Sequence, residues 1–180
     1  MSAGKLDRNR AALVVVDVQE AFRKALPSFA DVAAASATLV RGADAMSVPI
    51  LITEQYPKGL GETVPEVAEH LPDGARPIEK VRFSAAEADG FDLGGRSQAL
   101  VCGIEAHVCV NQTVLDLLDS GVEVHLATDA VGSRTEADRE VGLRRAERAG
   151  AVLTSVETAL FELLGGSDAA EFKEVQGLVK

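Results

Sequence analysis

The sequence predicts an α/β fold in which helices cover both faces of a parallel sheet, giving three α/β/α layers. Short runs of β-branched and other apolar residues alternate with longer stretches that have helical spacing, and this order of elements is typical of βα units. Runs such as LVVV and ALVCGI are almost continuously apolar, as expected of strands that helices bury on both sides. With 47% hydrophobic and 26% charged residues in 180, the chain can bury a substantial core.

The first half of the chain begins with a strand over residues 11–16, where the apolar run AALVVV stands. An alanine-rich stretch with spaced apolar residues predicts a helix over 31–46, and a second apolar run predicts a strand over 48–53. Residues 55–74 are rich in Gly and Pro and indicate a long loop beyond the end of this strand. Loops of that length within compact domains are commonly functional.

The middle of the chain continues the alternation with a short strand over 78–81 and a buried one over 99–104. A helix is expected over 108–118, because a Ser-Gly pair follows it as a C-terminal cap signal. A strand over 122–128 precedes a helix over 135–149. That helix carries acids early and arginines late and ends at a glycine, a distribution that suits the helix dipole.

The last elements expected are a strand over 151–154 and helices over 155–164 and 168–178. No internal repeat, low-complexity tract or linker interrupts the sequence, so residues 1–180 are predicted to form a single domain. Apolar residues near the C-terminus can either form a self-complementary patch or pack on the chain's own core. These residues are Phe172, Val175, Leu178 and Val179.

Composition limits the partners and the location of the protein. Lys and Arg total 18 against 28 Asp and Glu, a formal charge of -10, which repels nucleic acid and anionic membrane surfaces. The first ten residues are polar and lack the features of a signal peptide, and no apolar run approaches the ~18 residues that span a bilayer. A cytoplasmic protein that binds neither nucleic acid nor membrane is expected.

Polar residues stand where strands of the expected sheet end, and ligands of open α/β sheets bind at that edge. Asp17 follows LVVV, Lys80 ends the third strand, and Cys109 lies near the start of the helix after the fourth. A helix N-terminus is expected to lower the pKa of the Cys109 thiol, whereas Cys102 lies mid-strand and indicates a buried core residue. Singly, such an Asp or Lys is an ordinary turn or surface residue. Together, the three predict chemistry.

Further side chains near this edge are candidates for a substrate pocket, with ordinary loop packing as the alternative. His107, two residues before Cys109, either lines the pocket or lies at the surface, or forms a Cys–His pair with the nucleophile. The others follow Asp17 or end the second strand. They are Gln19, Phe22, Glu54, Gln55 and Tyr56.

Three segments carry a resemblance to a known family: VVVDVQEAF, the Glu79-Lys80 pair and CGIEAHVCVNQTVLDLL. They resemble the isochorismatase-like cysteine hydrolases, a group that includes nicotinamidases, N-carbamoylsarcosine amidases and isochorismatases. TEQYPKGLG, VHLATDAVGSRTEADR and FKEVQGLVK more specifically resemble the isochorismatase domain-containing proteins. The resemblance covers nearly the whole chain and implies a six-stranded parallel sheet in the order 3-2-1-4-5-6. It also implies a homo-oligomer.

The resemblance implies a catalytic triad of Asp17, Lys80 and Cys109. In that mechanism Asp17 takes the thiol proton, Lys80 balances the charge, and Cys109 attacks a carbonyl carbon to form a thioester that water hydrolyses. Backbone amides near the nucleophile stabilise the oxyanion, and a cis peptide joins Ile104 to Glu105. The amides implied are those of Ala106, His107, Val108 and Cys109.

One departure from the family pattern limits the reactions that are expected. Nicotinamidases carry an Asp-x-His metal motif after the second strand, whereas this chain has TEQY there, and its three histidines show no ligand spacing. No metal and no other cofactor is expected. The retained Cys109 favours a small carbonyl substrate, an amide, imide or related acyl compound. The alternatives are enol-ether hydrolysis that uses Asp17 alone, and a non-catalytic interaction protein on the same scaffold.

Overall fold

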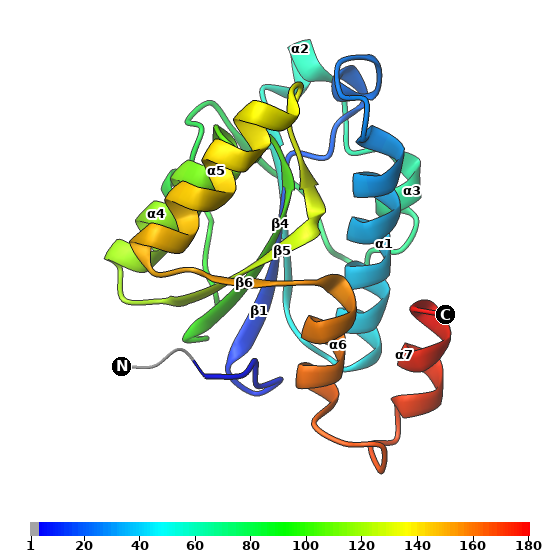
Figure 1. The fold of residues 1–180 in the computed structure, drawn as a ribbon. Coiled ribbons are helices and arrows are strands. Elements are labelled where there is room, and N and C mark those ends of the chain that lie inside the picture. Colours follow the sequence, from blue (N-terminus) through cyan, green and yellow to red (C-terminus); the bar gives the residue numbers. More distant parts are fainter. Residues whose placement is uncertain (1–3) are drawn as a thin grey trace.

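The computed structural model describes residues 4–180 and places one six-stranded parallel sheet between two layers of helices (Figure 1). The strand order is β3-β2-β1-β4-β5-β6, and every neighbouring pair is parallel. The expected fold class and strand order are therefore confirmed. The strands are β1 (Ala11–Val16), β2 (Ile50–Gln55), β3 (Ile78–Lys80), β4 (Gln98–Ile104), β5 (Glu123–Gly132) and β6 (Val152–Thr154).

Helices of unequal length cover the two faces of the sheet (Figure 1). One face is covered by α1 (Phe29–Ala45), α3 (Pro65–Ala68), α6 (Val156–Leu164) and α7 (Phe172–Leu178), and the other by α4 (Cys109–Asp119) and α5 (Glu136–Ala149). Three shorter elements are η1 (Glu20–Lys24), α2 (Pro57–Leu60) and η2 (Ala85–Glu87). Within the described residues, no helix has the length and apolarity that crossing a membrane requires.

Each strand sends alternate side chains to the two faces, and this produces two hydrophobic clusters. In β1, Leu13 and Val15 belong to the cluster under α1 and α6, whereas Val14 and Val16 belong to the cluster under α4 and α5. All four are fully buried, and each contributes ~1.5–3 kcal/mol relative to an exposed side chain. The period of two along a strand explains why the whole run is apolar.

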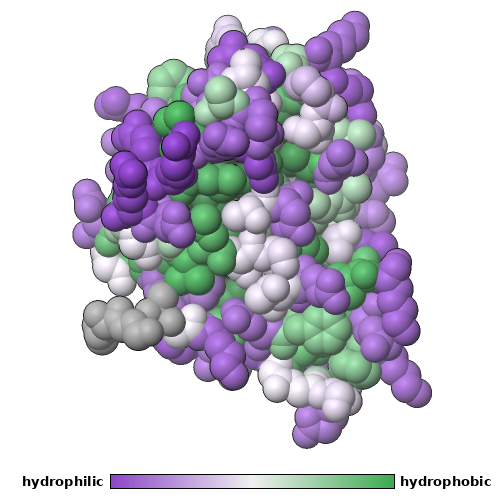
Figure 2. Space-filling view, viewed as in Figure 1, coloured by the Kyte–Doolittle hydropathy of each residue, from purple (hydrophilic) through white to green (hydrophobic). Residues whose placement is uncertain are grey.

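The surface outside these clusters is mostly hydrophilic, with apolar area beside α5 and over α6 and α7 (Figure 2). Phe161 of α6 and Phe172 of α7 meet edge to face at 6.3 Å between ring centroids. Val175 is fully buried, and Phe172 and Val179 pack against the cluster under α1. The apolar C-terminal residues therefore pack largely on the chain's own core.

Three expectations about element boundaries are corrected. The stretch 55–74 is not a plain loop, since α2 and α3 form within it, each with proline at its first turn, where the missing N–H costs nothing. The strand expected to end at 128 continues to Gly132, because a register shift after Val101 lets its last residues pair with Gly103 and Ile104. The last helix begins at Phe172 rather than at 168.

The end of β4 depends on a glycine at Gly103. Its φ is +120°, and a Cβ atom there would lie 2.0 Å from the carbonyl oxygen of Val16. Only a residue without a side chain permits this approach. It brings the carboxyl ends of β1 and β4 together, so that Asp17 and the loop after Ile104 start side by side.

Replacing Gly103 with alanine is expected to lower the free energy of unfolding by about 3 kcal/mol or more, since the new methyl group meets backbone in a left-handed conformation. Gly177→Ala is the matched control, because the glycine is helical and a Cβ there meets nothing within 4 Å. That variant should be unchanged or stabilised by up to about 1 kcal/mol. Urea unfolding measures both, and equal stability of the two variants would contradict the steric explanation.

Candidate active site

Asp17 is the first residue beyond β1 and is fully buried. Its φ of 52° lies in the left-handed region, which is uncommon for a residue other than glycine and clusters at functional sites. Both carboxylate oxygens are held: Oδ1 accepts a hydrogen bond from Thr53 Oγ1 at 2.7 Å, and Oδ2 accepts one from Lys80 Nζ at 2.7 Å. The carboxylate therefore has a fixed orientation.

Lys80 ends β3 and forms a buried ion pair with Asp17, the two side chains being 1% and 0% exposed. Its ammonium also donates to Gln55 Oε1 at 2.8 Å and to the carbonyl oxygens of Phe83 at 2.8 Å and Arg82 at 3.2 Å. A buried charge is tolerated only when it is paired and hydrogen-bonded, and this ammonium is surrounded by oxygen. Gln55 is brought there by strand register, since it pairs with Lys80 across β2 and β3.

Cys109 is the first residue of α4 and is 6% exposed. The pKa of its thiol is raised to about 12, chiefly by burial and also by the negative charge of Asp17, while the positive charge of Lys80 opposes the rise. The expectation of a lowered pKa is therefore wrong for this state. The thiol keeps its proton at neutral pH, and a thiolate nucleophile requires a base. Asp17 is the carboxylate whose charge acts on it.

The loop between β4 and α4 carries the amides expected to stabilise an oxyanion. The peptide bond between Ile104 and Glu105 is cis, at the position that the family resemblance implies. The Ala106 amide donates to Gly132 O at 2.8 Å and the Val108 amide donates to Glu105 O at 3.1 Å. Among hydrogen bonds within residues 4–180, none uses the amides of His107 or Cys109 as donor. Of the four expected amides, from Ala106 to Cys109, these two are the ones without an acceptor within the described residues.

Two of the expected pocket residues hold a loop instead. Gln19 is fully buried, with Nε2 donating to the carbonyl oxygens of Gln55 and Gly61 and Oε1 accepting from the Gln55 amide. Glu54 accepts hydrogen bonds from the amide and the hydroxyl of Thr63, both at 2.7 Å. Their polar atoms are occupied by protein, so they shape the site only through the loop that ends at residue 63.

The two aromatic candidates for the pocket, Phe22 and Tyr56, have different environments in the structure. Phe22 packs against the cluster under α1, which is a core role. Tyr56 has a φ of 38° and is 56% exposed, and its ring covers Gly59, where a Cβ atom would lie 2.6 Å from it. Tyr56 thus presents an aromatic face at the carboxyl end of the sheet.

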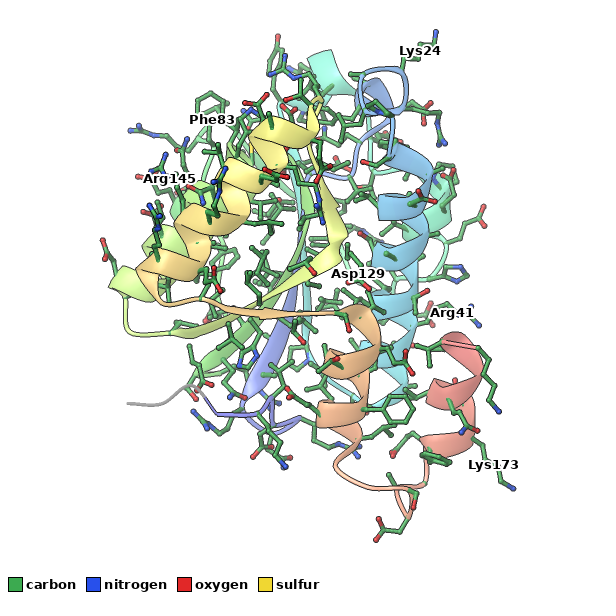
Figure 3. The ribbon with its side chains drawn as sticks, in the orientation of Figure 1. Lys24, Arg41, Phe83, Asp129, Arg145 and Lys173 are labelled. Carbon is green, nitrogen blue, oxygen red and sulfur yellow. The ribbon has the colours of Figure 1, made fainter. Side chains whose placement is uncertain are left out.

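A cavity of about 570 Å³ lies beside Lys80 at this end of the sheet. Val81 on its wall is 78% exposed. Phe83, whose carbonyl binds Lys80, is 51% exposed and lies at the periphery, on the side of the sheet that α4 and α5 cover (Figure 3). The cavity is lined by Tyr56, Pro57, Lys58, Glu79, Lys80, Val81, Arg82, Glu87, Ala88 and Asp89. It is a candidate substrate pocket with mixed charge.

His107 is directed to the β5–α5 connection, where its Nδ1 lies 3.0 Å from Ser133 Oγ. Within the described part of the chain, no hydrogen bond joins His107 to Cys109. The geometry therefore favours a role in holding the loop over a Cys–His pair. Thr53 is a site residue that the sequence reasoning missed. Strand register is the feature that could have identified it, because Thr53 pairs with Val16, the residue immediately before Asp17.

The chain matches a family model described as Isochorismatase domain over residues 11–158. It is 40% identical over 182 residues to human "Isochorismatase domain-containing protein 2", covering 99% of this chain and 87% of that protein. The chain belongs to the isochorismatase family. Asp17, Lys80 and Cys109 therefore lie within an isochorismatase domain.

Solved structures of isochorismatase-fold relatives carry different functional names. One is "Structure of MAR1 Ribonuclease from Caenorhabditis elegans", with 41% identity, a TM-score of 0.93, and coverage of 98% of this chain and 92% of that one. Another, the ycaC gene product of Escherichia coli, is described as an octameric hydrolase of unknown specificity, with 26% identity, a TM-score of 0.85, and coverage of 97% and 90%. These names agree on a hydrolase and leave the substrate open.

Among residues 4–180, no three His, Cys, Asp or Glu side chains come together in a group that could hold an ion. A metal-independent reaction without other cofactors stays a prediction.

Alkylation of Cys109 by iodoacetamide is expected to speed up about tenfold per pH unit between about pH 7 and pH 10, because the thiolate fraction rises by that factor below a pKa of about 12. Peptide mass spectrometry measures the rate at each cysteine. Cys102, which is completely buried, should stay unmodified in the folded protein, and Cys102→Ala should show the same profile. A rate that levels off below pH 9 would contradict the raised pKa.

Proposed function

We propose that this isochorismatase family member is a metal-independent cysteine hydrolase that cleaves a small amide, imide or related acyl compound through a thioester at Cys109. The observation that carries the proposal is the buried Asp17–Lys80 ion pair, 2.7 Å between charged atoms, whose charges act on the protonated thiol of Cys109. A carboxylate fixed beside a thiol that needs a base is the arrangement general-base activation requires.

In the first half of the reaction, Asp17 takes the proton of Cys109 as the sulfur bonds to the substrate's carbonyl carbon. The carbonyl electrons move to oxygen, and the amides of His107 and Cys109 donate hydrogen bonds to the oxyanion. When the tetrahedral intermediate collapses, the C–N bond breaks and Asp17 gives its proton to the leaving nitrogen. Lys80 keeps the Asp17 carboxylate oriented before and after this transfer through its 2.7 Å hydrogen bond.

In the second half, Asp17 acts as a base toward water. The hydroxide adds to the thioester carbon, and the same two amides hold the second oxyanion. Collapse breaks the C–S bond, the sulfur regains the proton that Asp17 carries, and the carboxylic acid leaves. One carboxylate thus serves both half-reactions, as its fixed position between Thr53 and Lys80 allows.

Incubation with a panel of small amides, imides and ureides is expected to add an acyl group to Cys109, because the thioester forms before water attacks. Intact-protein mass spectrometry detects the added mass, which also identifies the acyl group. Cys109→Ala should show no adduct and at least a 100-fold loss of turnover, as expected when a covalent nucleophile is removed.

Cys102→Ala is the matched control, since it removes the other thiol from the opposite face of the sheet and should keep the adduct. Turnover by Cys109→Ala at the wild-type rate would favour enol-ether hydrolysis by Asp17 alone. Neither adduct nor turnover with any member of the panel would favour a non-catalytic interaction protein.

Phosphodiester cleavage is a second candidate, because a relative with 41% identity is named a ribonuclease. The formal charge of -10 opposes it, since RNA binding depends largely on cationic contacts with phosphates. Single-stranded RNA should therefore stay intact on a denaturing gel with wild type, Asp17→Asn and Cys109→Ala alike. Cleavage by wild type that Asp17→Asn abolishes would overturn the amide proposal in favour of this one.

We also propose that the chain self-associates, as the octameric E. coli relative does. Three of its exposed large apolar side chains, Tyr56, Val81 and Phe83, follow the carboxyl ends of the neighbouring strands β2 and β3. Exposed apolar residues that gather in one place are typical of contact surfaces. A cytoplasmic location and the absence of nucleic-acid partners remain part of the same proposal.

A further inference from the structure

The loop that carries the nucleophile is held by the connection between β5 and α5. The last residue of β5 and the first two residues of that connection contact three consecutive residues of the loop. Gly132 O accepts from the Ala106 amide at 2.8 Å, Ser133 Oγ lies 3.0 Å from His107 Nδ1, and Arg134 binds Glu105. The loop conformation, and with it the direction of the His107 and Cys109 amides, therefore depends on this connection.

Within this set of contacts, the ion pair between Glu105 and Arg134 links the two segments through charge. Glu105 Oε1 accepts hydrogen bonds from Arg134 Nε at 2.9 Å and from the Arg134 amide at 3.1 Å. The backbone carbonyl of the same Glu105 accepts from the amides of Val108 at 3.1 Å and Val110 at 3.2 Å. One residue thus fixes both the turn into α4 and the attachment to β5.

The two partners differ in burial. Because of this difference, the effect of the ion pair on loop position can be distinguished from its effect on folding stability. The Glu105 side chain is 9% exposed and that of Arg134 is 60% exposed. An ion pair with one exposed partner adds little to folding stability, and charge-assisted hydrogen bonds still fix geometry. Removing the Arg134 side chain should leave a folded protein with a less restrained loop.

Packing against α5 also restricts where the loop can move. A Cβ atom built on Gly142 of α5 would lie 2.4 Å from Ala106 O and 2.9 Å from the His107 nitrogen. The helix backbone therefore presses directly on the peptide between Ala106 and His107. The loop contacts both α5 and the β5–α5 connection, and the ion pair between Glu105 and Arg134 is its charged attachment.

We infer that Glu105 and Arg134 are positioning residues that hold the amides of His107 and Cys109 where the oxyanion forms. This inference rests on the proposed thioester mechanism. It concerns the amides alone, because neither residue is hydrogen-bonded to Asp17, Lys80 or Cys109 among the side-chain contacts of residues 4–180.

Two chemical probes of Cys109 separate the amides from the thiol. Acylation by p-nitrophenyl acetate passes through an oxyanion, whereas alkylation by iodoacetamide is a displacement at carbon that forms none. Both need the same thiolate. The rates are compared at one pH, about 9, for wild type, Arg134→Ala, Glu105→Ala and Glu105→Gln. Arg144→Ala is the matched control, because Arg144 is also exposed and pairs with Glu140 only along the surface of α5.

Arg134→Ala and Glu105→Ala are expected to slow acylation about tenfold at saturating probe and to leave alkylation within twofold of wild type. Glu105→Gln keeps an oxygen acceptor for Arg134 and should retain at least a third of the wild-type acylation rate. Arg144→Ala should match wild type in both reactions. If Glu105→Ala fails to fold, the comparison of Arg134→Ala with wild type is sufficient, since the Arg134 side chain lies mostly in solvent.

Several results would overturn the inference. Equal slowing of both reactions would mean that the pair maintains the thiol site as a whole, and unchanged acylation would mean that the loop needs no such attachment. If the variants changed only the p-nitrophenyl acetate concentration that gives half of the maximal acylation rate, and not that maximal rate, Arg134 would be a binding residue. If wild-type Cys109 is alkylated but never acylated, the thioester proposal itself fails. That result differs from a loss seen only in the variants.

Discussion

The buried ion pair between Asp17 and Lys80 is the interaction on which the rest of the site depends. Removing two charges from water costs several kcal/mol per ion in practice, and their attraction compensates only when the remaining hydrogen-bonding capacity is satisfied. Thr53, Gln55 and the carbonyls of Arg82 and Phe83 supply those partners. The adjacency of β1, β2 and β3 is what brings them together, so the strand order is a requirement of the charge arrangement.

Burial also determines the protonation state of the Cys109 thiol. A helix N-terminus stabilises a nearby anion by ~0.3–1 kcal/mol, or ~2 kcal/mol in favourable partly buried geometries. Desolvation of a buried group shifts its pKa by up to ~3–5 units, each worth about 1.36 kcal/mol. Burial therefore wins at Cys109, whose pKa rises to about 12. In this state the site holds a protonated thiol beside the Asp17 carboxylate.

The sequence predicted what depends on local pattern and missed what depends on side-chain direction. Apolar runs located five of the six strands, and the short β3 was expected without such a run. The polar residues at two strand ends, Asp17 and Lys80, meet in the structure. Gln19 and Glu54 stand equally close to strand ends but turn toward backbone groups of the loop ending at residue 63. Nothing in the residue types distinguishes these directions. Strand register, which brings Thr53 to Asp17, becomes visible only once the neighbours of each strand are known.

The site draws its two kinds of group from opposite halves of the sheet. The charges come from the β1–β3 side, and the proposed nucleophile and the amides of His107 and Cys109 come from the loop after β4 and the start of α4, supported by β5 and α5. The halves meet where the chain switches direction across the sheet, between β1 and β4, the position at which open α/β sheets form their crevice. Gly103 sets their separation there by contact with Val16. Changes at this junction should therefore act on the proton transfer that the proposed mechanism places between Cys109 and Asp17. Changes at Tyr56 or Val81, which line the cavity beside Lys80, should act on the choice of substrate.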